Sequence, residues 1–96
     1  MGAADGGWFD WDEDNEGHVL DHGVDPAEVE EALLDPHGVG ADARNVAGEK
    51  REALIGATEP GRILHIVYTM RGEKVRPIIA RGADGTEKRR YRGERR

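Results

Sequence analysis

The sequence predicts an α+β domain in which two helices pack on one antiparallel sheet and a short basic helix follows the sheet. Two helix starts headed by Asp lie in the first third of the chain, and three β-rich runs joined by short turns lie in the second half. The length of 96 residues leaves room for one hydrophobic core. We therefore expect the element order βααβββα and a single domain over residues 8–92, with a disordered leader over residues 1–7 and a basic tail over residues 93–96.

The first strand and helix are predicted from local residue patterns. Residues 8–11 alternate apolar and polar side chains, as a short strand does. Asp12 is a suitable N-cap for a helix over residues 13–22, and Gly23 is suited to end that helix in the left-handed conformation.

A second helix is predicted to begin at Pro26, where Asp25 supplies the N-cap and Glu28 closes a capping box. Apolar residues then recur at helical spacing, and Pro36 stops the helix.

The second half of the chain predicts an antiparallel meander. Residues 37–50 are rich in Gly, Ala, Asp and Asn and predict a loop with room for one weak strand. Strands are expected over residues 51–58, 63–70 and 75–81, because two short turns separate these β-rich runs. Pro77 lies inside the last run, which places that strand at an edge or gives it a bulge.

Composition limits the classes of function. With 36% hydrophobic residues and 35% charged residues, the core must be thin, and a partner that covers apolar surface is expected. The absence of cysteine excludes disulfides, thiolate metal sites and a cysteine nucleophile, and it fits a reducing cytoplasm. No apolar run is long enough to span a bilayer and no secretory signal pattern opens the chain, so we expect a cytoplasmic protein.

The charges divide the chain into an acidic front and a basic back. Residues 1–35 contain twelve Asp or Glu and no Lys or Arg, whereas residues 44–96 contain fourteen Lys or Arg against seven Asp or Glu. This asymmetry indicates either a basic face for an anionic polymer or ordinary solvated surfaces of mixed charge.

A set of residues spread over most of the chain resembles the BrnT family. In chain order these residues are Phe9, Trp11, Asp12, Asn15, His18, His22, Gly23, Val24, Pro26, Glu28, Val29, Glu30, Glu31, Leu54, Ile55, Gly56, Gly61, Arg62, Leu64, Tyr68, Thr69, Arg71, Gly72, Val75, Arg76, Ile79, Ala80, Arg81 and Tyr91. Their order and spacing over residues 9–91 carry the resemblance.

The resemblance implies a RelE-like fold and a ribonuclease toxin of a type II toxin–antitoxin pair. It also implies a ribbon-helix-helix antitoxin as protein partner, RNA as substrate, and repression of the operon by the toxin–antitoxin complex on operator DNA. The chain differs from many members at Asp21, where they carry Lys, and at Ala80, which follows Ile79 directly where they carry an intervening Ser. A second hypothesis is therefore a non-catalytic module that keeps the toxin fold and its RNA or antitoxin interface.

Cleavage of RNA without a metal or other cofactor needs a base, a cation that holds charge on the phosphorane, and an acid. We expect His22 to act as general acid or base, because it lies at a helix C-terminus one turn after His18. The other interpretation is that His22 only caps the helix while His18 packs on a tryptophan.

A metal site is the third hypothesis. His18 and His22 are spaced as two ligands on one helix face, and Asp residues lie nearby. The helical zinc motif that carries a Glu is absent, and no third ligand has a fixed spacing. We therefore expect no metal-binding residues.

Arg81 is the expected phosphate-binding catalytic residue, at the end of the last strand. Strand alternation puts Arg76 on the opposite face from Arg81 unless Pro77 introduces a bulge. Arg76 is either a weaker catalytic candidate or a solvated residue balanced by Glu73.

The basic C-terminal segment is the expected RNA-binding element. Asp84 and Glu87 form another capping box, ahead of a short basic helix or tail over residues 88–96. Tyr91 could act in the site or stack on a base, or it could only anchor the helix to the sheet. His65 is expected to be a satisfied core or edge residue. The residues expected to bind RNA are Arg71, Lys88, Arg89 and Arg90.

Overall fold

A computed structural model describes residues 7–93, with three helices and five strands in that range. The helices are α1 (Glu13–Asp21), α2 (Pro26–Leu33) and α3 (Gly85–Tyr91), and the strands are β1 (Val39–Gly40), β2 (Arg44–Val46), β3 (Glu49–Ala57), β4 (Ile63–Arg71) and β5 (Lys74–Gly82). Residues 1–6 and 94–96, which hold most of the expected leader and tail, lie outside the described residues.

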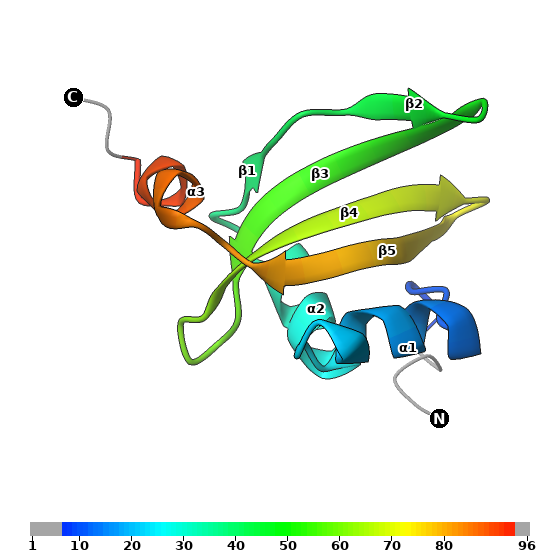
Figure 1. The fold of residues 1–96 in the computed structure, drawn as a ribbon, viewed down its shortest axis with the longest axis horizontal. Helices are drawn as coiled ribbons and strands as arrows, with labels where there is room; N and C mark the ends of the chain where they lie inside the picture. The colour runs from blue at the N-terminus through cyan, green and yellow to red at the C-terminus, as the bar shows by residue number, and fades with distance from the viewer. Residues whose placement is uncertain (1–6, 94–96) are drawn as a thin grey trace.

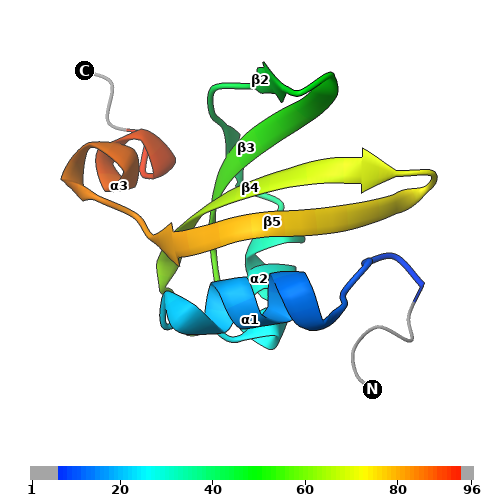
Figure 2. The ribbon, with the colours of Figure 1, turned by 45° about the vertical axis from the view of Figure 1, so that its right-hand side comes forward.

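The strands form an antiparallel sheet in the order β1-β3-β4-β5, and β2 pairs with the other end of β3. Helices α1 and α2 cover one face of this sheet, while the short β1–β2 arm and α3 lie away from them (Figure 1). A view turned by 45° shows α3 beyond the end of β5 (Figure 2). The expected α+β class is confirmed, with two helices on an antiparallel sheet and a short basic helix after it.

All three predicted helix caps are present. Asp12, Asp25 and Asp84 each accept hydrogen bonds from backbone N–H groups of the first helical turn, and a side chain three residues later bonds back to each cap. In α1 the returning side chain is Asn15 rather than an acidic residue. Gly23 has φ 78° directly after the C-cap His22, as its place after the helix predicts.

The core lies between the two helices and the sheet. Its fully or almost fully buried members come from α1, the α1–α2 connection, α2, β4 and β5: Val19, Val24, Val29, Ala32, Leu64, Ile66 and Ala80. Helix α2 approaches β3 closely at Gly56, where an added Cβ would lie 2.3 Å from the carbonyl oxygen of Ala32. Only glycine fits this position without movement of the backbone.

The β4–β5 hairpin contains a bulge next to Pro77. Tyr68 pairs with Pro77, whereas Val67 pairs with Ile79, so Ile78 is an extra residue on β5. The bulge changes every pairing toward the end of β5: a regular hairpin would pair His65 with Ala80, but the observed partner is Arg81. Pro77 lies beside this bulge and β5 is an edge strand of the sheet, so both of the features predicted for this strand are present.

Two predictions about local structure need correction. Residues 8–11 form no strand; Phe9 makes a single parallel bridge with Val75, because the chain turns at Asp12 into α1. The first of the three predicted β-rich runs, β3, begins at Glu49 rather than residue 51, and the preceding loop contains two short strands rather than one.

Candidate active site

The face of the sheet opposite α1 and α2 carries a groove of about 390 Å³. Its floor is apolar and includes Ile55, Val67 and Ile79. Charged and polar side chains surround this floor: Asp42, Arg44, Arg51, His65, Glu87 and Arg90. Among residues 7–93, no Phe, Tyr or Trp side chain lines the groove, so its apolar floor could contact a flat base only through aliphatic groups, while the arginines among its charged residues could bind phosphates.

Beside the groove, the carboxylate of Glu87 lies between Arg81 and His65; of these three residues, Glu87 and His65 line the groove. Nη1 and Nη2 of Arg81 each donate to one oxygen of Glu87, both at 2.9 Å. Nε2 of His65 lies 3.8 Å from Glu87 Oε2. His65 and Arg81 are cross-strand partners in the β4–β5 hairpin, and Glu87 reaches them from α3.

The surroundings adjust the protonation of both titratable groups. Burial lowers the pKa of His65, and this effect outweighs the opposing pull of Glu87. The hydrogen bonds from Arg81 lower the pKa of Glu87 to about 2, against the cost of burial. At neutral pH the site therefore presents a neutral imidazole, which can accept a proton, beside a paired guanidinium and carboxylate.

The cations of the groove differ in how they are held. Within residues 7–93, Arg44 has no hydrogen bond or ion pair from its side chain. Arg51 is paired with Glu49 at 3.2 Å, and Arg90 donates to the carbonyl oxygen of Gly40 at 2.9 Å. Arg44 is thus free to bind an anion without breaking an existing contact.

His22 does not lie in this groove. It follows α1, whose Val19 is packed in the core with Leu64 and Ala80 on the other side of the sheet. The His22 ring stacks on that of His18, with centroids 5.2 Å apart, and its Nδ1 lies 3.1 Å from the His18 carbonyl oxygen. The structure therefore does not bring His22 and Arg81 together, although both were expected in one site.

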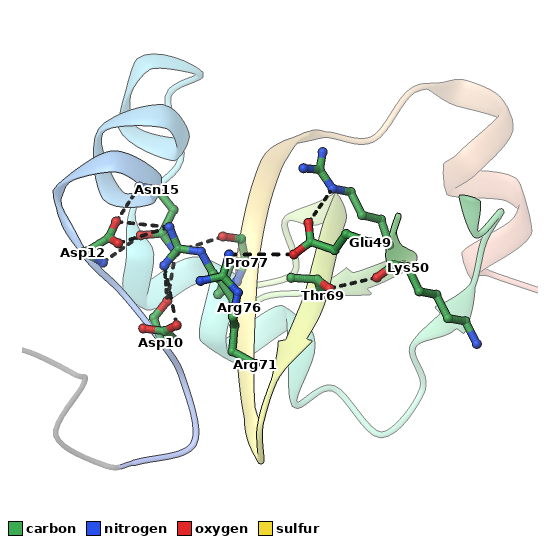
Figure 3. A network of polar contacts seen from close by, with 10 residues as sticks. Asp10, Asp12, Asn15, Glu49, Lys50, Thr69, Arg71, Arg76 and Pro77 are labelled. Atoms are coloured by element: carbon green, nitrogen blue, oxygen red, sulfur yellow. Dashed lines mark hydrogen bonds and ion pairs between the residues drawn. The ribbon is translucent and has the colours of Figure 1, made fainter. Parts of the chain in front are cut away.

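Arg76 and Arg71 are both held by carboxylates at the outer part of the hairpin (Figure 3). Arg76 lies 3.1 Å from Asp12 and 3.6 Å from Asp10, and its side chain is only 11% exposed. Its partners are these two residues rather than the expected Glu73. Arg71 lies 3.7 Å from Glu49 and is half-exposed. Arg76 consequently ties the segment before α1 to β5.

The remaining expected residues lie on α3. Tyr91 donates its hydroxyl to Asp35 at 2.5 Å, and this hydrogen bond raises the pKa of Tyr91. This contact holds α3 to the connection after α2, rather than directly to the sheet as the anchoring alternative expected. Arg89 is exposed and donates to Thr86, while Lys88 lines a separate shallow hollow with Arg62 and Arg92. Of the four expected RNA-binding residues, only Arg90 lines the groove.

Sequence reasoning missed His65 because its position depends on the bulge. Counted from the Arg71–Lys74 turn without an extra residue, His65 would be opposite Ala80. Pro77 was the available signal, since a proline inside a strand indicates a bulge. Allowing one extra residue in β5 would have paired His65 with Arg81.

Two structural features of the described residues bear on metal ions and membranes. Within residues 7–93, no group of three or more His, Asp or Glu side chains is arranged to hold a metal ion. None of the three helices in that range is long and apolar enough to cross a bilayer.

The fold and the groove describe a small α+β protein with a histidine–arginine–carboxylate cluster on an open sheet face. Residues 11–87 match the family model of the ribonuclease toxin BrnT of type II toxin–antitoxin systems. The match covers most of the chain, so the protein belongs to the BrnT family. No curated protein has a sequence that matches this chain.

Proposed function

We propose that the protein is an endoribonuclease toxin that cleaves single-stranded RNA in the groove, with His65 as general base and Arg81 as the cation that stabilises the phosphorane. The observation that carries this proposal is the pairing of a half-buried His65 with Arg81 at one end of a groove rimmed by Arg44 and Arg90. In this proposal His65 replaces His22, because Arg81 has His65 as its neighbour.

The proposed reaction is an internal transfer at phosphorus. His65 takes the proton of a ribose 2′-OH, and the 2′-oxygen attacks the adjacent phosphorus. Arg81 binds the nonbridging oxygens as negative charge develops on them. The bond from phosphorus to the 5′-oxygen breaks, water protonates the leaving oxygen, and a 2′,3′-cyclic phosphate remains.

The proposed partner is a ribbon-helix-helix antitoxin, and the RelE-like assignment of the fold is part of the same proposal. Membership in a family of type II toxins supports an antitoxin. The apolar groove floor and its cations offer a surface that an acidic antitoxin segment could cover, which would block RNA. We further propose that the complex represses its own operon through the antitoxin.

Cleavage of a labelled RNA oligonucleotide in the presence of EDTA tests the activity. We expect EDTA-resistant cleavage that ends in a 2′,3′-cyclic phosphate, and no cleavage where a 2′-deoxynucleotide replaces the residue before the cut. Arg81→Ala should lower the rate at saturating RNA by roughly 100-fold or more. Binding of RNA without cleavage would favour the non-catalytic module. The observation that favours this second hypothesis is that Arg81 is already bound to Glu87.

A further inference from the structure

Glu87 contacts both groups to which the proposed reaction assigns a role. Its two oxygens accept from Nη1 and Nη2 of Arg81 at 2.9 Å, and one of them lies 3.8 Å from Nε2 of His65. The Glu87 side chain is 17% exposed, so water competes with these contacts only in part. Through these hydrogen bonds, Glu87 ties α3 to the end of β5.

The hydrogen bonds of Arg81 leave one edge of its guanidinium open. A guanidinium has five N–H donors in a planar fork. Nη1 donates to Glu87 and, at 3.1 Å, to the carbonyl oxygen of Gly82, which uses both of its hydrogens. Nη2 donates once to Glu87. Within residues 7–93, the Nε–H and the second Nη2 hydrogen therefore have no partner.

These two free donors lie on the same edge of the planar group and point in parallel. Two parallel N–H donors are the arrangement that binds two oxygens of a phosphate bidentately. The contact with Glu87 thus uses the end of the guanidinium and leaves its side edge for an oxyanion. By this count of donors, and because the Arg81 side chain is 42% exposed, a phosphate could bind Arg81 while Glu87 keeps its own two hydrogen bonds.

We propose that Glu87 is a positioning residue that clamps the end of the Arg81 guanidinium and presents its Nε–Nη2 edge to the RNA phosphodiester. This inference rests on the proposed function, in which Arg81 stabilises the phosphorane. Glu87 itself touches neither the phosphate nor the attacking oxygen; it fixes the direction of the group that does.

Helix capping is the competing role for Glu87. Its carboxylate also accepts from the backbone N–H of Asp84 and closes the capping box of α3. Glu28 provides a matched control, because it closes the capping box of α2 and accepts from an arginine, Arg62, at 2.9 Å. Only one nitrogen of Arg62 reaches Glu28, and Glu28 does not line the groove.

Steady-state cleavage by Glu87→Gln and Glu28→Gln separates the two roles. Glutamine is accepted at this position of a capping box, so both variants keep their helix starts. We expect Glu87→Gln to lower kcat by about 10- to 100-fold with little change in KM, because a small misplacement of a catalytic group is costly. Glu28→Gln should keep the wild-type kcat. An unchanged kcat in Glu87→Gln, or an equal loss in Glu28→Gln, would overturn the proposal.

A titration of the wild-type chain with inorganic phosphate tests the clamp without cleavage. We expect the NMR signal of the Arg81 Nε–H to move while the carboxyl carbon of Glu87 keeps its shift. Movement of the Glu87 carboxyl signal with a stationary Nε–H would show that phosphate displaces Glu87, and the clamp would be refuted. Because this readout needs no reaction, it stays decisive even if the chain cuts no RNA.

Discussion

Replacement of Asn15 by alanine should destabilise the fold more than any other change of a single polar side chain in α1. Asn15 is 4% exposed, and its amide makes three hydrogen bonds. Nδ2 donates at 2.9 Å to the carbonyl oxygens of Asp10 and Pro77, and Oδ1 accepts from the backbone N–H of Asp12 at 2.8 Å. These contacts join the segment before α1 to the bulge of β5.

The magnitude follows from how buried each contact is. Pro77 is fully buried, so its carbonyl oxygen would lose its Asn15 partner at a cost of about 1–3 kcal/mol. The other two hydrogen bonds are part-buried. Each contributes about 0.5–1 kcal/mol, because water can replace part of the lost interaction when the Asn15 amide is removed. The sum is about 3 kcal/mol, which corresponds to a fall in Tm of about 12–24 °C for a domain of this size.

Urea unfolding followed by circular dichroism measures this loss. Asn45→Ala is the matched control, because Asn45 is exposed on β2 and its side chain has no hydrogen bond to any of the described residues 7–93. The control should unfold within about 0.5 kcal/mol of the wild type. A loss below about 1 kcal/mol in Asn15→Ala would refute the conclusion that Asn15 holds α1 to the bulge.

Three further predictions concern packing, pH and RNA binding. Gly56→Ala should lower the free energy of unfolding by about 2–3 kcal/mol, because the new Cβ would lie 2.3 Å from the Ala32 carbonyl oxygen; wild-type stability in urea would contradict the close approach. The pKa of Glu87 is lowered from 4.5 to about 2, so its stabilising contribution is complete above about pH 4.5 and is lost as the pH falls toward 2. The urea midpoint of Glu87→Gln should therefore fall less steeply with acid than that of the wild type, and parallel curves would count against the ion pair with Arg81. Binding of single-stranded RNA should weaken with salt by a slope of about -0.7 per phosphate contact, and Arg44→Ala should reduce the slope by about one contact; a slope that Arg44→Ala leaves unchanged would exclude this residue from the interface.

Much of the fold could be predicted because local residue chemistry determines it. The Asp N-caps and the turns between β-rich runs act within a few residues, and they predicted where α1 and α2 begin and the order of β3, β4 and β5. Residues 8–11 were wrongly predicted to form a strand. Alternation of apolar and polar residues predicts only an extended chain, whereas the number of paired residues depends on where this segment leaves its neighbour, and here only Phe9 pairs with Val75.

The candidate site could be predicted only in part. Arg90 lines the groove and Arg81 is the cross-strand partner of His65, which lines it; both arginines were expected from the sequence. His65 was expected to be a satisfied core or edge residue, because a histidine inside an apolar run gives no sign in the sequence of polar neighbours on other strands. Its neighbourhood with Arg81 depends on a one-residue bulge and on the docking of Glu87 from α3, and no local pattern encodes that combination.

His22 illustrates the opposite case. Its place at a helix end beside a glycine suggested a general acid. However, α1 packs on the face of the sheet opposite the groove, and this position of the helix determines which residues His22 can contact. Asn15 and Arg76 are among the residues that carry the family resemblance. In the structure, both residues hold the segment before α1 against β5.

A comparison of His65→Ala with His22→Ala tests the central claim most directly. Both variants would be assayed at saturating single-stranded RNA in EDTA, after circular dichroism has shown that they fold. We expect His65→Ala to lose roughly 100- to 10,000-fold in cleavage rate, since it removes the base, and His22→Ala to cut at nearly the wild-type rate. If His22→Ala loses activity while His65→Ala keeps it, the active site does not lie in the groove of the open sheet face.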